Sequence, residues 1–237
     1  MNNLKNDQLK QLEDSFYNDG YRLAKECLSG KLSTENIHKL LKTGYRYIDN
    51  FLDLFLQHSR NSNVPEACTK GCSFCCSQSI FILPHEVWYL KEFIKNSFTD
   101  KEKEEIRARI KARYKRTKNK NTKELANVKI KCALLRNDVC SVYDASPLAC
   151  RIYLSKSADS CRQQLLGKSN EGQIAELYAL PLKLGRMFNE GVVKFLTEKH
   201  LDVYEWTLES NLLKALNSTI EEWLNSVPVF SRNESNK

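Results

Sequence analysis

Apolar residues recur at helical spacing through the first sixty positions of the chain. Steps of three, four and seven predict a helix from about residue 4 to 28, with an apolar face of Leu9, Leu12, Phe16, Leu23 and Cys27. A second helix is expected to begin with Ser33 or Thr34 as its N-cap. Its apolar face consists of Ile37, Leu40, Leu41, Ile48, Phe51, Leu52 and Phe55. Because each apolar face needs a partner, we expect the two helices to pair.

The pattern changes after these helices. The stretch HSRNSNVPEA, at 58–67, lacks periodicity and contains Asn, Ser and Pro, which predicts a loop. The stretch SIFIL, at 79–83, is short, apolar and partly β-branched, as in a brief strand or a buried extended segment. Pro84 suits the first position of a helix through PHEVWYLKEFIKN, and a long helical region is expected from about 100 to 128.

Turn-rich sequence then runs from about 131 to 161, and helices return over about 171–199 and 202–226 before the polar tail SRNESNK. Strand signals are few, so we expect a mainly α fold: a helical domain with cysteine-rich loops organised around metal and few or no short strands. Three parts are expected within one compact domain. They are an N-terminal helical pair (1–62), a cysteine-cluster metal-binding region with an inserted basic helix (63–165) and C-terminal helices (166–237).

Composition excludes some classes of protein. The 237 residues are 41% hydrophobic and 28% charged, as in ordinary globular proteins, and no run approaches the roughly 20 apolar residues of a membrane span. We therefore expect no contact with a membrane. The polar start MNNLKNDQLK has no apolar core of a secretion signal, which predicts a cytoplasmic protein. In a reducing compartment, clustered cysteines favour metal binding over disulfides.

Four of the nine cysteines lie in one short stretch, CTKGCSFCC, as Cys68, Cys72, Cys75 and Cys76. Two residues separate Cys72 from Cys75, a spacing at which a tight turn directs both sulfurs at one metal. Cys75 and Cys76 are adjacent, and neighbouring side chains diverge. The stretch therefore predicts either two metal centres or one loop shared by a larger cluster.

Four more cysteines follow in the turn-rich segment, namely Cys132, Cys140, Cys150 and Cys161. The total of eight matches two complete tetrathiolate sites, and we expect mixed sites that take sulfurs from both segments. The alternative is that the later four are scattered core cysteines. The ninth, Cys27, belongs to the apolar face of the first helix and is expected in the core.

Four thiolates around Zn²⁺, or around an oxidised four-iron cluster, leave about −2 per site and favour nearby cations. Lys70, Arg136, Arg151 and Arg162 lie within the cysteine segments. Arg151 directly follows Cys150 and is the preferred hydrogen-bond donor to the sulfurs. CTKGCSFC also matches the CxxxCxΦC pattern of radical S-adenosylmethionine enzymes, but the predicted helices around it do not continue as their strand–helix barrel does.

Residues 66–162 resemble the YkgJ-type cysteine-cluster proteins, which are described as zinc- or iron-chelating domains. The stretch CTKGCSFCC, the helix opening at PHEVWYL, and then CSVY and SPLACRIY occur in the order of that family. The resemblance implies metal ligation by Cys68, Cys72, Cys75, Cys76, Cys132, Cys140 and Cys150, with Tyr143, Pro147 and Arg151 as motif positions. Ser146 stands where the family usually has arginine.

The family resemblance implies a metal cofactor, zinc or iron, with a [4Fe–4S] cluster among the options. All-thiolate ligation suits both metals, so the sequence does not choose between them. A related cysteine arrangement occurs in flagellin lysine methylases. This makes an enzyme that methylates protein with S-adenosylmethionine the alternative function, although no glycine-rich cofactor loop accompanies the cysteines.

A basic segment from Lys101 to Lys123 contains eleven Lys or Arg and three Glu, a net charge of +8 that equals the net charge of the whole chain. Such a stripe could attract nucleic acid or another polyanion, and a metal-stabilised nucleic-acid-binding module is a further alternative. The competing interpretation is a solvated helix face. His85, near the cysteines at a helix start, is expected to cap or face solvent more readily than to replace a thiol.

Overall fold

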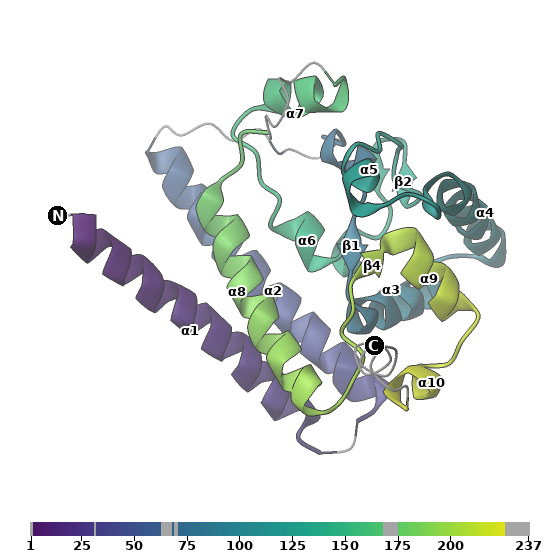
Figure 1. The fold of residues 1–237 in the computed structure, drawn as a ribbon, viewed down its shortest axis with the longest axis horizontal. Coiled ribbons are helices and arrows are strands. Elements are labelled where there is room, and N and C mark those ends of the chain that lie inside the picture. The colour runs from purple at the N-terminus through teal and green to yellow at the C-terminus, as the bar shows by residue number, and fades with distance from the viewer. Residues whose placement is uncertain (1, 31, 63–67, 69–70, 168–174, 226–237) are drawn as a thin grey trace, which may run out of the picture.

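The computed structural model describes residues 2–30, 32–62, 68, 71–167 and 175–225 (Figure 1). Within these ranges the chain forms ten α-helices, two short 3-10 turns and two small sheets of two strands each. The predicted mainly α fold is confirmed. The tail SRNESNK and the cation Lys70 lie outside the described residues.

Three long helices form one side of the molecule: α1 (Asn2–Leu28), α2 (Thr34–Asn61) and α8 (Ala179–Glu198) (Figure 1). The predicted contact between α1 and α2 is present, but the main partner of α1 is α8. Glycines allow the two backbones to approach closely. A Cβ atom added at Gly20 would lie 2.0 Å from the carbonyl oxygen of Phe188. Only a residue without a side chain fits this crossing.

The second helix begins as predicted. Ser33 is its N-cap, and the Ser33 side chain accepts a hydrogen bond of 3.3 Å from the backbone N–H of Asn36. The helix continues further than expected, through Asn61, so the first residues of the predicted loop 58–67 are helical. No proline or glycine lies between Gly44 and Pro65, and the helix can therefore extend through polar Ser and Asn. Residues 63–67 of that loop lie outside the described residues.

The other side of the molecule combines helices with a small sheet (Figure 1). Strand β1 (Phe81–Ile82) pairs antiparallel with β4 (Trp206–Thr207), which confirms a brief strand at SIFIL. The helices are α3 (Pro84–Ser97), α4 (Asp100–Thr117), α5 (Thr122–Ala126), α9 (Leu208–Leu216) and α10 (Ile220–Leu224). Helix α9 packs against both α3 and α4. This packing joins the C-terminal part to the middle of the chain.

Several predicted helix bounds are wrong. The helix expected from about 171 begins at 179, so that Pro181 falls in its first turn, where its missing N–H costs no hydrogen bond. Residues 171–174 lie outside the described residues. The helix expected over 202–226 is divided into β4, α9 and α10, because Thr219 and Glu222 form a capping box that starts a new helix. The region 100–128 likewise divides where Asn121 and Glu124 form a capping box.

The remaining elements carry cysteines of the two segments or flank them. They are η1 (Cys75–Ser77), β2 (Leu135–Arg136), β3 (Val139–Cys140), η2 (Tyr143–Ala145), α6 (Leu148–Arg151) and α7 (Ala158–Leu165). One hydrophobic cluster runs from Phe16 in α1 to Trp223 in α10. Cys27 is buried in that cluster, as its position on the apolar face predicted.

Among the described residues, no helix combines the length and the apolar character that crossing a membrane demands.

Candidate metal centre

The first cysteine segment makes two tight turns. Gly71, directly before Cys72, has a φ of +93°, a conformation that favours glycine. Cys75 and Cys76 then sit in the 3-10 turn η1, where the backbone N–H of Cys76 donates to the carbonyl of Ser73 at 3.1 Å. All four cysteines of this segment are partly exposed. The segment therefore presents its thiols near the surface instead of in the apolar core.

Backbone hydrogen bonds join this segment directly to the second one. The N–H of Cys132 donates to the carbonyl of Cys76 at 2.7 Å, and the N–H of Ile130 donates to the carbonyl of Ser77 at 2.9 Å. These bonds connect positions far apart in the sequence. The two cysteine segments therefore lie side by side in the fold, and metal sites shared between them remain a prediction.

Cys140 lies on a β-hairpin. Strands β2 and β3 pair antiparallel, with Leu135 opposite Cys140. The turn between them has positive φ at Asn137 (52°) and Asp138 (59°), as in the tight turns that match the twist of two-residue hairpins. Asparagine and aspartate tolerate this conformation better than other residues with side chains. The hairpin therefore returns Cys140 toward Cys132, on whose thiol it acts.

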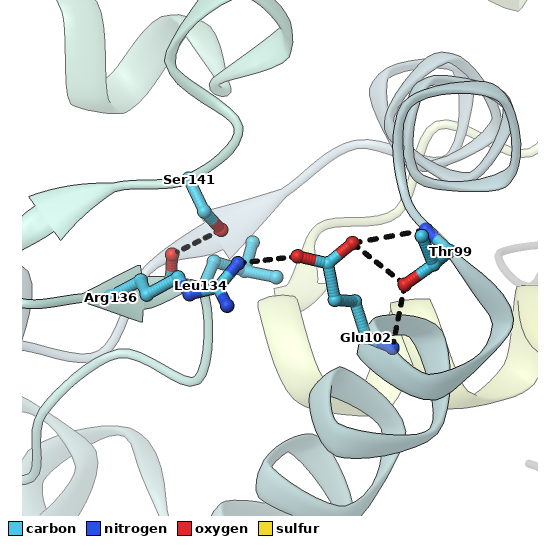
Figure 2. Close-up of polar contacts among 5 residues, drawn as sticks. All are labelled: Thr99, Glu102, Leu134, Arg136 and Ser141. Atoms are coloured by element: carbon cyan, nitrogen blue, oxygen red, sulfur yellow. Dashed lines mark hydrogen bonds and ion pairs between the residues drawn. The ribbon is translucent and has the colours of Figure 1, made fainter.

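The hairpin is also fixed to the start of α4 (Figure 2). Arg136 Nη1 donates to Glu102 Oε1 at 2.5 Å, while the other Glu102 oxygen accepts from the N–H of Thr99 at 3.0 Å. The Arg136 guanidinium lowers the pKa of Glu102 to about 2, with help from the Thr99 donors. The Ser141 hydroxyl donates to the carbonyl of Leu134 at 2.7 Å. These bonds hold the cysteine hairpin against the helix that carries the basic segment.

Cys68 and Cys161 meet from opposite ends of the cysteine region. The backbone N–H of Ser155 donates to the Cys68 sulfur at 3.1 Å, and Ser155 also interacts with the Cys161 thiol. Burial raises the pKa of Cys68, and the nearby thiols of Cys75, Cys72 and Cys161 raise it further, against the opposing effect of the Ser155 bond. Helix α7, which carries Cys161, packs against η1. These four cysteines therefore lie near one another.

A second group of thiols surrounds Cys150. Cys150 is exposed to solvent on one side, but the surrounding protein atoms partly remove it from water and raise its pKa well above the ordinary value. The thiols of Cys132, Cys140 and Cys75 contribute to the same shift. Burial raises the pKa of Cys132 to about 11. Most of these thiols are thus neutral at physiological pH.

Cys75 and Cys76 form the link between the two groups. A hydrogen bond from the Cys76 thiol lowers the pKa of Cys75 to about 7, while the same bond raises the pKa of Cys76. The thiols of Cys150 and Cys132 also raise the pKa of Cys76. The two adjacent thiols therefore contact each other, whereas their side chains were expected to diverge.

Arg151 is the centre of a buried polar network. Its Nη1 pairs with Asp49 at 2.6 Å, its Nε donates to the carbonyl of Ser146 at 3.0 Å, and its Nη2 donates to the carbonyls of Tyr143 (3.1 Å) and Asp144 (2.7 Å). These bonds fix the turn that precedes Cys150 to helix α2. The predicted donation of Arg151 to sulfur remains a prediction, and its charge acts on Cys140 by lowering that pKa against the effect of burial.

Two residues of the predicted motif have defined places in the structure. Tyr143 is 68% exposed, and its ring lies 6.0 Å from the Arg151 guanidinium, so its tie to the network is mainly its backbone carbonyl. Pro147 precedes α6 and accepts from the N–H of Cys150 at 2.9 Å. Arg162, the last of the predicted nearby cations, pairs with Asp159 at 2.6 Å. That pair is exposed on α7.

A buried carboxylate anchors the helix that carries Cys150. Glu86 accepts hydrogen bonds from the N–H of Leu148 (2.8 Å), the Tyr45 hydroxyl (3.0 Å) and the N–H of Leu83 (3.2 Å). Burial raises its pKa against the effect of these donors. The neighbouring His85 is 1% exposed, so the expectation that it faces solvent is wrong, and burial lowers its pKa to about 3. The apolar stretch SIFILP leads directly into α3, and this accounts for the burial of both residues at the start of that helix.

Sequence reasoning missed a second buried network. Arg113 belongs to the basic segment by sequence, but its side chain is only 3% exposed. Its Nη1 donates to the carbonyl of Ile130 at 2.7 Å, its Nη2 donates to the carbonyl of Gln78 at 2.7 Å, and its Nε lies 2.5 Å from Oε1 of the buried Glu209. The signal was present, because Arg113 follows Ile110 at helical spacing on the buried face of α4.

The arrangement does not amount to a complete ligand set. In the part of the chain that the structure describes, no three His, Cys, Asp or Glu side chains are disposed so that they could hold a metal ion. All nine cysteines are free. The fold thus brings the predicted thiols into one region without turning their sulfurs to a common point. Comparison with known proteins finds no matching family model, no matching curated protein and no matching solved structure.

Proposed function

We propose that this protein binds metal through eight clustered cysteines, as zinc or as iron, with a [4Fe–4S] cluster among the iron forms. The observation that most supports the proposal is the 2.7 Å backbone hydrogen bond from Cys132 to Cys76, which joins the two cysteine segments. Free thiols from distant segments are a donor set that suits soft metals, and all of the eight except the buried Cys161 are at least partly exposed. A core of scattered cysteines would be buried among apolar residues, as Cys27 is.

We divide the eight thiols into two sets of four that meet at Cys75, whose thiol also acts on Cys76, Cys140 and Cys150. The first thiol set is Cys68, Cys72, Cys75 and Cys161, and the second thiol set is Cys76, Cys132, Cys140 and Cys150. Each set takes sulfurs from both cysteine segments. Four thiolates complete the coordination of one Zn²⁺ ion or of one four-iron cluster. We therefore assign one metal centre to each set.

Binding would require two local changes. The sulfurs would have to turn toward a common point, which requires rotation about the χ1 angle of the cysteines. The thiols would also have to lose their protons, since the metal ligand is the thiolate. Burial holds the pKa of Cys68, Cys132 and Cys140 above its ordinary value, so metal uptake should release protons and weaken as the pH falls. When bound, the metal would crosslink the segments that carry the two sets.

Elemental analysis of anaerobically purified protein tests the proposal. We expect about two equivalents of zinc per chain, or iron with the brown colour of an iron–sulfur centre. Changing Cys72→Ser should remove the metal of the first thiol set, and Cys150→Ser that of the second. Both variants should melt at lower temperature than the original, because metal binding adds to folding stability.

The matched control is Cys27→Ser, a change of the same size at a cysteine in the hydrophobic core. It should lower stability modestly and leave the metal content unchanged. Metal well below one equivalent in the original protein contradicts the proposal, and so does full metal retention in Cys72→Ser. The lysine-methylase alternative is tested separately by calorimetry with S-adenosylmethionine. Saturable binding to the metal-loaded protein would favour that alternative.

A further inference from the structure

The basic segment has two chemically different halves. Residues 100–105 contain four acidic side chains, whereas residues 106–123 contain nine Lys or Arg and no Asp or Glu. Two of the four acidic residues at the start of α4 have partners within the protein. Asp100 pairs with Lys103, and Glu102 caps the helix and pairs with Arg136. The excess positive charge therefore belongs to the second half of α4 and to the turn and short helix that follow it.

Three arginines of this half are part of the fold. Arg113 is buried, Arg109 donates to the carbonyl of Ala133 at 2.9 Å, and Arg107 donates to Asn217 at 2.9 Å. These guanidinium groups tie α4 to the second cysteine segment and to the end of α9. They are not free to contact a partner, and substituting them would test stability more than binding.

The other six cations are exposed. They are Lys111, Lys115, Arg116, Lys118, Lys120 and Lys123, which we call the basic surface. In the described part of the chain, no side chain forms an ion pair or hydrogen bond with any of these six side chains. Lys111, Lys115 and Lys118 recur at steps of four and three and lie along one side of the helix. With a rise of 1.5 Å per residue, the first two are about 6 Å apart along the helix axis.

We propose that the basic surface binds the phosphate backbone of nucleic acid without reading its sequence. A spacing of about 6 Å is close to two phosphate steps of 3.4 Å along one strand of a duplex. Five of the six cations are lysines, which act as mobile point charges on phosphates and lack the planar fork that arginine uses to recognise guanine. Tyr114 is half-buried, so the surface offers no exposed aromatic platform for bases.

An anionic membrane is a poorer partner for this surface. Membrane-binding helices combine cations with exposed apolar side chains that enter the headgroup region. The exposed large hydrophobic residues of the described chain are Leu12, Leu54, Val139, Tyr143, Leu166 and Trp206. None of them lies between 106 and 123. Charge without an apolar anchor favours a polyanion that is bound through its charges alone.

The test is fluorescence anisotropy with a labelled 20-base-pair duplex of mixed sequence, titrated with the full-length protein at several salt concentrations. Six phosphate contacts predict a loss of affinity of about 10³-fold between 50 and 200 mM salt, and similar affinity for an unrelated sequence. The triple variant Lys111→Glu, Lys115→Glu and Lys118→Glu should bind at least about tenfold more weakly at 50 mM salt. Its log–log salt slope should be shallower by about 3.

The matched control reverses three exposed lysines on the other side of the molecule, Lys10, Lys39 and Lys42, and so changes the net charge equally. We expect its affinity to stay within about threefold of the original. Equal weakening in both variants would show a net-charge effect and would overturn the proposal. No binding at 50 mM salt would also overturn it, as would binding to vesicles of anionic lipid without binding to the duplex. Metal content should be the same in both variants, so this test is independent of the cysteines.

Discussion

Replacing Arg113 by methionine would remove the positive charge between the two cysteine segments while keeping a side chain of similar length. Glu209, which is 1% exposed, would then be a buried carboxylate without its ion-pair partner. Breaking a buried pair from one side costs about 3–5 kcal/mol. The carbonyls of Ile130 and Gln78 would lose their donors as well. We therefore expect a total loss of about 5 kcal/mol, a large share of the roughly 5–15 kcal/mol by which proteins are stable.

The loss of stability in Arg113→Met should also depend on pH. Burial already raises the pKa of Glu209, and Arg113 opposes that effect. Without Arg113 the pKa rises further, so the folded variant retains a proton that the unfolded chain releases. Its stability should then fall as the pH rises above the ordinary pKa of glutamate, by up to about 1.4 kcal/mol per pH unit. The loss relative to the original protein should be smaller at pH 5 than at pH 8.

Urea unfolding of chelator-treated protein at both pH values measures this loss without a contribution from metal. Adding Glu209→Gln to the variant should remove its extra pH dependence, since no titratable group is left at the site. The matched control is Arg109→Met on the same helix, which loses one hydrogen bond to a carbonyl and should cost about 1–2 kcal/mol. A loss below about 1 kcal/mol for Arg113→Met at pH 8, or an equal loss at both pH values, would refute the reasoning.

Two further substitutions test the packing and the Arg151 network. Gly20→Ala should destabilise the protein by about 2 kcal/mol or more in thermal unfolding, because the new Cβ would meet the Phe188 carbonyl oxygen. Gly30→Ala, with no atom within 4 Å of its Cβ, should change stability by less than about 0.5 kcal/mol. Arg151→Lys should cost about 2–4 kcal/mol, because one ammonium cannot satisfy Asp49 and three carbonyls together, and an unchanged melting temperature would contradict this.

Sequence periodicity predicted the helices well where an apolar face was long and continuous. The first two helices and the helix at Pro84 lie close to their expected positions. Periodicity failed at 202–226, where apolar spacing continues through two separate helices. The break depends on a capping box at Thr219 and Glu222, which outweighs the apolar pattern around it. Periodicity also could not identify the main partner of α1, because an apolar stripe does not specify which distant helix will cover it.

The cysteines could be identified from spacing, but their neighbours could not. Which thiols share a set depends on hydrogen bonds such as that between Cys132 and Cys76, and these arise only when the chain has folded. The buried arginine was missed because eleven cations close together in the sequence suggested a solvated surface. Helical spacing places these cations on different faces of the helix. Arg113 follows Ile106 and Ile110 onto the buried face of α4, and Lys111 and Lys115 point elsewhere.

The packing of α1 on α8 has a consequence for how the chain folds during its synthesis. About 150 residues separate the end of α1 from the start of α8, and they include both cysteine segments. At 5–20 residues per second, the ribosome needs roughly 8–30 s to produce them. The apolar stripe of α1 waits for its main partner throughout that interval, and α2 alone covers part of it. Nascent chains are therefore expected to rely on chaperones until residue 198 has emerged from the ribosome.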